Sequence, residues 1–309
     1  MLYVGTELGI FRRIDDGATW MAPVAPIEAA MQTSVVAFDP RNPSIAYAGT
    51  AYTGVLKSED RGETWRVLTD VKDGPTAVTA LTVDPAAPST LYAGSYAGVN
   101  GALYRSLDGG ATWRGEFIGP GDATIRSIAV DPSTQAEVYV GTDFFAFKST
   151  HSGLWQRLGE QQYVTAQPIN VMAVALDPRS PQTLYAGTAA TVGFEGPPVG
   201  DGVYSSKDAG ASWSALHGGM RPNTPVRALS LLPDTGILYA GTSYGVFQLS
   251  AGDQSWRAVN DGLDGSDVKA LAYSRSSDCL YAATWNRLFK LVDASREAES
   301  RAPRDVRFR

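Results

Sequence analysis

The sequence is poor in the residues that carry most enzyme and metal chemistry. It has one cysteine, Cys279, and two histidines, His151 and His217. A single cysteine excludes an intrachain disulfide, and this set does not supply the spaced Cys and His ligands of a zinc site. No glycine-rich phosphate-binding loop occurs either. We therefore expect no cofactor, no metal ligands and no histidine-based catalytic cluster.

Long apolar runs and an excess of positive charge are also missing. No stretch approaches the roughly 18 apolar residues of a membrane-spanning helix. The net charge of -6 argues against a nucleic-acid partner, which would need a basic surface. The first residues already read as a strand and lack the positive and apolar segments of a signal peptide. We expect a cytoplasmic protein if the chain is complete, and an exported one if an N-terminal signal was removed.

What the sequence has in abundance is repetition. The phrase Leu-Tyr-Ala-Gly-Thr recurs in variants, with its tyrosine at Tyr3, Tyr47, Tyr92, Tyr139, Tyr185, Tyr239 and Tyr281. Successive tyrosines are 44, 45, 47, 46, 54 and 42 residues apart. This period accommodates four short strands and their turns, the content of one propeller blade. An apolar strand ending in Asp-Pro precedes several copies, and proline stops a strand because it has no amide hydrogen.

In most repeats a third strand leads into a turn with the pattern Ser-x-Asp-x-Gly-x-Thr-Trp, which Ser58–Trp65 and Ser106–Trp113 match completely and the last repeat lacks. Aspartate can accept backbone amide hydrogens across this turn, glycine supplies a positive φ, and tryptophan covers apolar area between repeats. Since the turn recurs once per repeat, its carboxylates should lie far apart, which favours a structural role over metal binding. The predicted structural residues are Asp15, Gly17, Trp20, Asp60, Gly62, Trp65, Asp108, Gly110, Trp113, Asp208, Gly210 and Trp213. Shorter, degenerate copies run from Ser149 to Trp155 and from Ser250 to Trp256.

This turn resembles the Asp-box, or BNR, repeat of sialidases, sortilin-type receptors, xyloglucan-degrading hydrolases and the photosystem II assembly and stability factor. The resemblance covers Leu2 to about Val292, and short single-domain members of the assembly-factor-like group look most similar. It implies an all-β fold: a seven-bladed β-propeller of four-stranded antiparallel blades, with incomplete first and last blades. We expect one domain over 1–292. The polar tail, 293–309, should be disordered or provide a strand that closes the ring.

The ligand face of a propeller is formed by loops between second and third strands and by loops that lead into the next inner strand. An aromatic residue recurs just after Gly-Thr, either to cap the blades or to stack against a sugar or an extended peptide. These residues are Tyr52, Tyr96, Phe144, Tyr244 and Trp285, with Phe194 in the insertion at 189–202. That insertion is either a specificity loop or a neutral lengthening of one repeat.

One aligned position near the start of the inner strands reads Ser34, Thr79, Arg126, Met172, Arg227 and Lys269. Its three cations form a candidate site for a carboxylate, a phosphate or an acidic segment of a partner. The alternative is that they are solvated or pair with Asp143, Glu195 or Asp267. Arg126, Asp143, Glu195, Arg227 and Lys269 therefore join the aromatic residues as candidate binding residues.

Enzyme classes known for such repeats need more than the sequence offers. A sialidase-like reaction needs an arginine cluster, a Tyr nucleophile with a Glu base, and an acidic proton donor, and the Arg-Ile-Pro segment of sialidases is absent. A xyloglucan-type hydrolase needs two carboxylates facing across a cleft, usually between two propellers. We predict no catalytic residues and a monomeric, assembly-factor-like scaffold that binds a protein or other ligand on its loop face. The alternative is a glycoside hydrolase or a carbohydrate-binding propeller.

Overall fold

The computed structural model divides into two compact units. Unit 1 comprises Met1–Thr142 and Phe147–Gln156, and unit 2 comprises Asp143–Ala146 and Arg157–Arg309. The structure describes residues 2–13, 20–21, 32–68, 74–96, 102–118, 123–133, 137–149, 154–159, 169–189, 202–260, 262–263, 265–275 and 277–292. Within these ranges there is no helix long and apolar enough to cross a bilayer.

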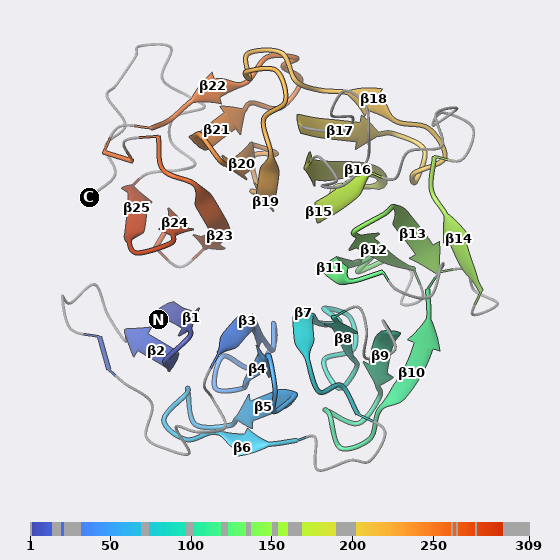
Figure 1. Cartoon of the computed structure of the whole chain (residues 1–309), viewed down its shortest axis with the longest axis vertical. Helices are drawn as coiled ribbons and strands as arrows, with labels where there is room; N and C mark the ends of the chain where they lie inside the picture. The colour runs from blue at the N-terminus through green and yellow to red at the C-terminus, as the bar shows by residue number, and fades with distance from the viewer. Residues whose placement is uncertain are drawn as a thin grey trace. The chain divides into compact units, whose positions relative to one another are not determined.

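Unit 1 contains one two-stranded sheet and three four-stranded antiparallel sheets, each built from consecutive strands (Figure 1). The first sheet pairs β1 (Leu2–Thr6) with β2 (Gly9–Arg13). The four-stranded sheets contain β3 (Thr33–Phe38), β4 (Ala46–Thr50), β5 (Val55–Ser58) and β6 (Arg66–Val67); β7 (Val78–Val83), β8 (Leu91–Ser95), β9 (Ala102–Ser106) and β10 (Arg114–Phe117); and β11 (Ile125–Val130), β12 (Val138–Thr142), β13 (Ala146–Ser149) and β14 (Trp155–Arg157). Of these strand residues, Ala146 and Arg157 are assigned to unit 2.

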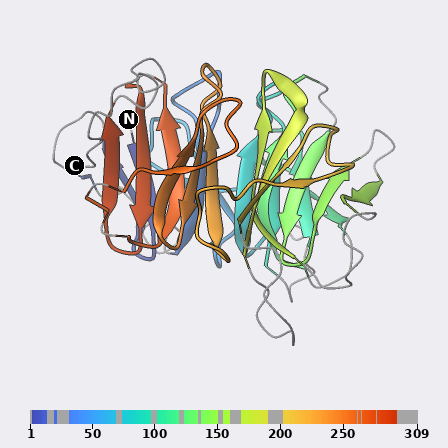
Figure 2. The same ribbon diagram turned by 90° about the horizontal axis from the view of Figure 1, so that it is seen from above.

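Unit 2 contains two four-stranded sheets and a three-stranded one, again from consecutive antiparallel strands (Figure 2). They are formed by β15 (Asn170–Asp177), β16 (Ser180–Ala189), β17 (Gly202–Ser206) and β18 (Ser214–Ala215); β19 (Val226–Leu231), β20 (Leu238–Thr242), β21 (Gly245–Leu249) and β22 (Arg257–Ala258); and β23 (Val268–Ser274), β24 (Cys279–Thr284) and β25 (Leu288–Val292).

The sheets confirm the predicted all-β fold of four-stranded antiparallel blades. Within the described residues, seven sheets match the seven tyrosine phrases, and the first and last of them have fewer than four strands. The first sheet has an additional backbone bridge between Arg12 and Met21, just after Trp20. The predicted ring-closing tail, 293–309, lies outside the described residues. The single domain proposed for 1–292 remains a prediction.

The core lies between successive sheets rather than within any one of them. In unit 1, Tyr47 and Val55 of one sheet pack with Leu91 and Trp113 of the next. In unit 2, Val203 packs with Leu238, Ala240 and Trp256 in the same way. A single blade cannot bury its apolar face, so stacking on a neighbour provides the stability. Burial also raises the pKa of the Tyr47 hydroxyl to about 12.

Glycine precedes threonine in the repeated phrase because the next sheet approaches closely at that point. A Cβ added to Gly94 would clash with Ile125 Cγ2, at the start of β11. In unit 2 a Cβ on Gly241 would lie 2.7 Å from Val268 Cγ1, at the start of β23. The last repeat has alanine, Ala283, at the equivalent position. The glycine is therefore required by packing between sheets rather than by backbone conformation.

Candidate functional site

Each four-stranded sheet has two chemically different ends, shown by its register. In the sheet β7–β10, Val83 pairs with Leu91, which in turn pairs with Ser106, so the Asp-Pro turn and the Ser-x-Asp turn share one end. Val78 pairs with Ser95, so the start of β7 and the hairpin after β8 share the other end. We call these the turn end and the loop end.

The turn end is held by side chains that hydrogen-bond to the local backbone. Ser106 Oγ accepts the Gly110 amide at 2.8 Å and donates to Asp108 Oδ1 at 2.8 Å. Asp108 Oδ1 also accepts the Thr112 amide at 2.8 Å. The buried Trp113 donates its indole N–H to the Gly110 carbonyl at 3.0 Å. Gly110 has φ +90°, a conformation that side chains disfavour, so each residue of the pattern has a structural task.

The serine, aspartate and glycine contacts recur in the copies at Asp60 and Asp208. The Trp213 indole N–H donates to the Gly210 carbonyl at 3.1 Å, whereas the buried Trp65 indole N–H has no hydrogen bond among the described residues. Gly62 and Gly210 have φ of +73° and +89°, and Trp65 and Trp213 are buried. Hydrogen bonds to the neighbouring Thr or Ser lower the pKa of Asp108 and Asp208 to about 2. At Asp60, desolvation raises the pKa, and hydrogen bonds from Thr64 and Ser58 together outweigh it, giving about 2. No group of three His, Cys, Asp or Glu side chains that could hold a metal ion occurs in the described part of the chain. Asp15 and Gly17 lie outside that part.

The degenerate copies use their tryptophans differently. Trp155 is only partly buried and donates to Glu116 Oε2 at 3.3 Å. Trp256 is buried and donates to the Leu216 carbonyl at 2.7 Å. At the first repeat, Trp20 is partly buried, and the guanidinium carbon of Arg13 lies 5.3 Å from its ring centroid.

The loop end carries hairpins anchored by the threonine of the repeated phrase. Thr50 Oγ1 donates to the Gly54 carbonyl at 3.0 Å and accepts the Thr53 amide at 2.9 Å. Thr242 Oγ1 makes the matching bonds, to the Gly245 carbonyl at 2.9 Å and from the Tyr244 amide at 3.0 Å. A small hydroxyl therefore fixes the hairpin whose tip presents the recurring aromatic residue.

Most of the aromatic residues at these tips are exposed to solvent. Trp285 is 81% exposed, Tyr52 75%, Tyr96 55% and Tyr244 39%, whereas Phe144 is partly buried. In unit 1 the tips that carry Tyr52 and Tyr96 flank one short segment. The Gly54 amide donates to Thr76 O and the Tyr96 amide donates to Ala77 O, each at 3.1 Å. Two exposed tyrosines thus stand at the loop ends of two neighbouring sheets.

A β-bulge occurs near the start of β3, β7, β11, β15, β19 and β23, which are the first strands of six sheets. The register shifts across Ser34, Thr79, Arg126, Met172, Arg227 and Lys269. These are the six positions aligned in the sequence. A bulge adds one residue to the strand and re-aims its side chain, which places this residue at the loop end in each sheet.

In unit 1 the bulged residue can connect neighbouring sheets. Thr79 Oγ1 donates to the Gly94 carbonyl at 3.1 Å and to the Ile125 carbonyl of the next sheet at 2.6 Å. Ser34 Oγ donates in the same way to the carbonyls of Gly49 and Val78. A short hydroxyl at the bulge therefore joins two sheets through their backbones.

In unit 2 two bulges carry cations that share one carboxylate. Arg227 Nε lies 2.9 Å from Asp267 Oδ1, and Lys269 Nζ lies 2.6 Å from Asp267 Oδ2. Desolvation alone would raise the pKa of Asp267, but hydrogen bonds from Lys269 and Arg227 lower it. Lys269 Nζ also lies 5.4 Å from the centroid of the Trp285 ring.

The structure brings together only part of the predicted site. Arg227, Lys269 and Trp285 form one connected cluster in unit 2, whereas Arg126 belongs to unit 1. Phe194 and Glu195 lie outside the described residues, as does 190–201 of the insertion.

One residue of the loop end, Arg221, was not among the residues predicted from the sequence. The guanidinium carbon of Arg221 lies 5.2 Å from the centroid of the Tyr244 ring. Arg221 precedes β19 by five residues and follows no repeated pattern, so no signal in the sequence distinguished it.

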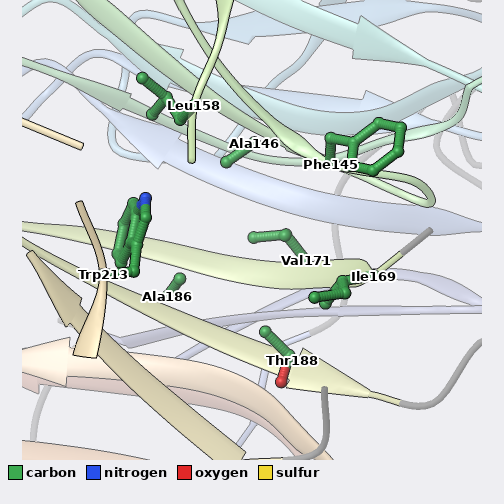
Figure 3. A pocket seen from close by; sticks show the side chains of 8 residues that line it. All are labelled: Phe145, Ala146, Leu158, Ile169, Val171, Ala186, Thr188 and Trp213. Atoms are coloured by element: carbon green, nitrogen blue, oxygen red, sulfur yellow. The ribbon is translucent and has the colours of Figure 1, made fainter. Parts of the chain in front are cut away.

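A cavity of about 20 Å³ lies within unit 2, away from these groups (Figure 3). Its walls are apolar apart from one hydroxyl, and they are formed by Phe145, Ala146, Leu158, Ile169, Val171, Ala186, Thr188 and Trp213. This volume holds about one water molecule, so the cavity is a packing gap rather than a ligand site.

No protein-family model matches the sequence. A xyloglucanase of Hypocrea jecorina (strain QM6a) is 33% identical over 156 residues, which are 49% of this chain and 17% of that protein. The xyloglucanase Xgh74A of Acetivibrio thermocellus is 26% identical over 207 residues, covering 58% of this chain and 23% of that protein. The chain therefore matches less than a quarter of the length of these curated relatives.

Three solved structures share the fold. An ancestral GH74 enzyme superposes with a TM-score of 0.80 at 17% identity, over 96% of this chain and 43% of that chain. The GH74 xyloglucanase from Xanthomonas campestris gives 0.75 at 17% identity, over 99% and 52%. A structure described as YCF48 bound to D1 peptide gives 0.67 at 15% identity, over 94% and 89%. At these identities the similarity shows the fold alone, which is a β-propeller.

Proposed function

We propose that this chain is a carbohydrate-binding β-propeller that takes an extended, xyloglucan-like polysaccharide on its loop ends. One observation carries the proposal: exposed aromatic residues stand on threonine-anchored hairpins at equivalent positions of the repeats. Tyr52 and Trp285, 75% and 81% exposed, are the clearest examples. An exposed ring costs apolar hydration without contributing to the core, so its recurrence at equivalent hairpin positions is better explained by a ligand than by packing.

The chemistry of a polysaccharide suits such a surface. One face of a pyranose ring presents C–H groups that pack on an aromatic ring, while its hydroxyls stay hydrated or bond to nearby polar groups. Neighbouring aromatic tips, such as Tyr52 and Tyr96 in unit 1, would contact successive parts of an extended chain. The similarity to xyloglucanases supports this ligand class.

Binding without hydrolysis is the activity that we propose for this chain. Glycoside hydrolysis needs two carboxyl groups on either side of the scissile bond. The loop-end carboxylate of Asp267 is occupied by Arg227 and Lys269, which suits an anchoring role rather than proton transfer. The similar GH74 enzyme structures are about twice as long as this chain, so their activity need not reside in the matched part.

A second candidate function is protein binding by an assembly-factor-like scaffold. The observation that favours it is length: the structure of YCF48 with D1 peptide matches this chain over 89% of its own length. The Asp-box assignment of the turn also stays a proposal, supported by the recurrent Ser, Asp and Gly contacts at the turn ends.

The test is affinity electrophoresis and calorimetry with tamarind xyloglucan, using Trp285→Ala and the double variant Tyr52→Ala/Tyr96→Ala. We expect the wild type to be retarded and each variant to bind about tenfold more weakly or worse, as for the loss of a stacking anchor. Leu107→Ala is the control, because Leu107 is 62% exposed but lies in a turn-end loop.

Each outcome separates the candidate functions. Xyloglucan binding that is unchanged in both aromatic variants would overturn the proposed surface. No binding to xyloglucan, with capture of an extended peptide by the wild type, would favour the scaffold function. Release of reducing sugar from xyloglucan would replace binding with hydrolysis.

A further inference from the structure

Several charged side chains gather at the loop end of unit 2. The chain carries a net charge of -6, yet Arg221, Arg227 and Lys269 are all in or beside this loop end, with Asp267 as the carboxylate between two of them. Among these four side chains the cations exceed the carboxylate by two charges. A local excess of this kind attracts anionic ligands even on an acidic protein.

The groups form a continuous arrangement across two neighbouring sheets. Arg221 lies against Tyr244, and the backbone beside Tyr244 is joined to the start of β19 by a bond from the Ser243 amide to Pro225 O, at 3.2 Å. From β19, Arg227 reaches Asp267 of the next sheet. Asp267 in turn holds Lys269, which lies against Trp285. Along the loop end, the Tyr244 ring is followed by three cations and the Asp267 carboxylate, and then by the Trp285 ring.

Arg227 is held in place but keeps most of its donors. Asp267 accepts from its Nε, and the two terminal NH₂ groups bond to no other described side chain or carbonyl. A guanidinium fixed in this way presents a planar pair of donors that matches a carboxylate. The Arg227 side chain is 30% exposed and that of Lys269 is 37%, so both are partly shielded yet reachable.

The geometry points to a subsite for a carboxylate-bearing sugar, a uronic acid unit, on the loop end of unit 2. The sugar ring would stack on the open face of Trp285, and its carboxylate would bind Arg227 and Lys269. The subsite rests on the proposed polysaccharide function and adds selectivity for acidic over neutral glycans. Unit 1 has no such pair at its first two bulges, where Ser34 and Thr79 bond to backbone carbonyls.

The test compares two polymers of one backbone: neutral xyloglucan and xyloglucan whose primary hydroxyls have been oxidised to carboxylates. At low salt we expect the oxidised polymer to bind the wild type about tenfold more tightly, and this advantage to shrink as salt is raised. The double variant Arg227→Met/Lys269→Met should lose the advantage, so that the two polymers bind it with equal affinity. Methionine is compatible with the bulge, since Met172 occupies the same position in the sheet β15–β18.

The control variant is Arg275→Met, which removes one cation at the opposite end of β23, where Arg275 pairs with Asp234 at 3.4 Å. It should leave the preference for the oxidised polymer unchanged. Equal binding of the two polymers by the wild type would overturn this subsite while leaving the proposed function intact. Failure of both polymers to bind would overturn the proposed function itself. Tight binding of poly-glutamate, with neither polymer bound, would show instead that the cluster recognises acidic peptides.

Discussion

Two bulges of unit 1 and two of unit 2 put the same backbone irregularity to different uses. Each has β-bulges near the start of its first strands, but in unit 1 Ser34 and Thr79 turn short hydroxyls back onto backbone carbonyls of two sheets. In unit 2 the equivalent Arg227 and Lys269 extend to a shared carboxylate and to an exposed tryptophan. The comparison teaches that a repeat conserves a geometric position, whereas the side chain decides whether that position stabilises the fold or is available for binding.

The largest expected effect on stability concerns the glycine of the repeated phrase, which packs against the next sheet in both units. Gly94→Ala in unit 1 and Gly241→Ala in unit 2 should each lower the free energy of unfolding by about 1–3 kcal/mol, because the added methyl group meets Ile125 or Val268 of the next sheet. Ala283→Gly is the control and should cost no more than about 1 kcal/mol, through backbone entropy. Urea denaturation measures these values. Equal losses at Gly94 and Ala283 would show that close approach of the sheets does not require the glycine.

The next largest effect on stability concerns the bulged positions, where Thr79 of unit 1 and Arg227 of unit 2 have different contacts. Thr79→Val keeps the shape of the side chain but removes the donor to Gly94 O and Ile125 O, so we expect a loss of about 0.5–1.5 kcal/mol in the free energy of unfolding. Arg227→Met should change that free energy by less than about 0.5 kcal/mol, because the side chain is a partly exposed ion-pair partner. The opposite ranking would mean that the cation, rather than the hydroxyl, stabilises its sheets.

The smallest expected effect is a loss of stability at low pH. Asp60 and Asp108 in unit 1 and Asp208 in unit 2 have pKa values of about 2, below the ordinary 3.8. A carboxyl group with a lowered folded-state pKa contributes stability above pH 4 or so, and that contribution is lost as the pH falls toward about 2. Amide hydrogen exchange should therefore accelerate across this window more in unit 1, which has two described complete turns, than in unit 2, which has one.

The variants Asp60→Asn/Asp108→Asn and Asp208→Asn should flatten the acid response in unit 1 and in unit 2 respectively. Asp234→Asn serves as the control, because that exposed carboxylate pairs with the exposed Arg275. Acceleration that is equal in both units and in all variants would remove these carboxylates as the cause.

Much of the fold could be predicted because the repeats share short sequence patterns with local structural effects. Tyrosine spacing predicted the number of sheets, and Asp-Pro and Ser-x-Asp patterns act through hydrogen bonds to residues two to four positions away. The aligned bulge position was also visible, since it recurs at the same offset from each Asp-Pro or equivalent turn. What could not be predicted is which of these residues meet. Arg126, Arg227 and Lys269 looked equivalent in the sequence, and it took the structure to show that Arg227 and Lys269 are joined through Asp267.

By itself the sequence determined the all-β repeat, the structural chemistry of the turn ends and the recurrence of an aromatic residue at the loop ends, because each depends on contacts that are short in sequence. Only the tertiary structure decided that Trp285 is exposed, that Arg221 lies against Tyr244 and that Asp267 holds two cations. Arg227 and Asp267 are 40 residues apart, and Arg221 and Tyr244 are also distant in the sequence, so these contacts depend on how the folded strands bring side chains together.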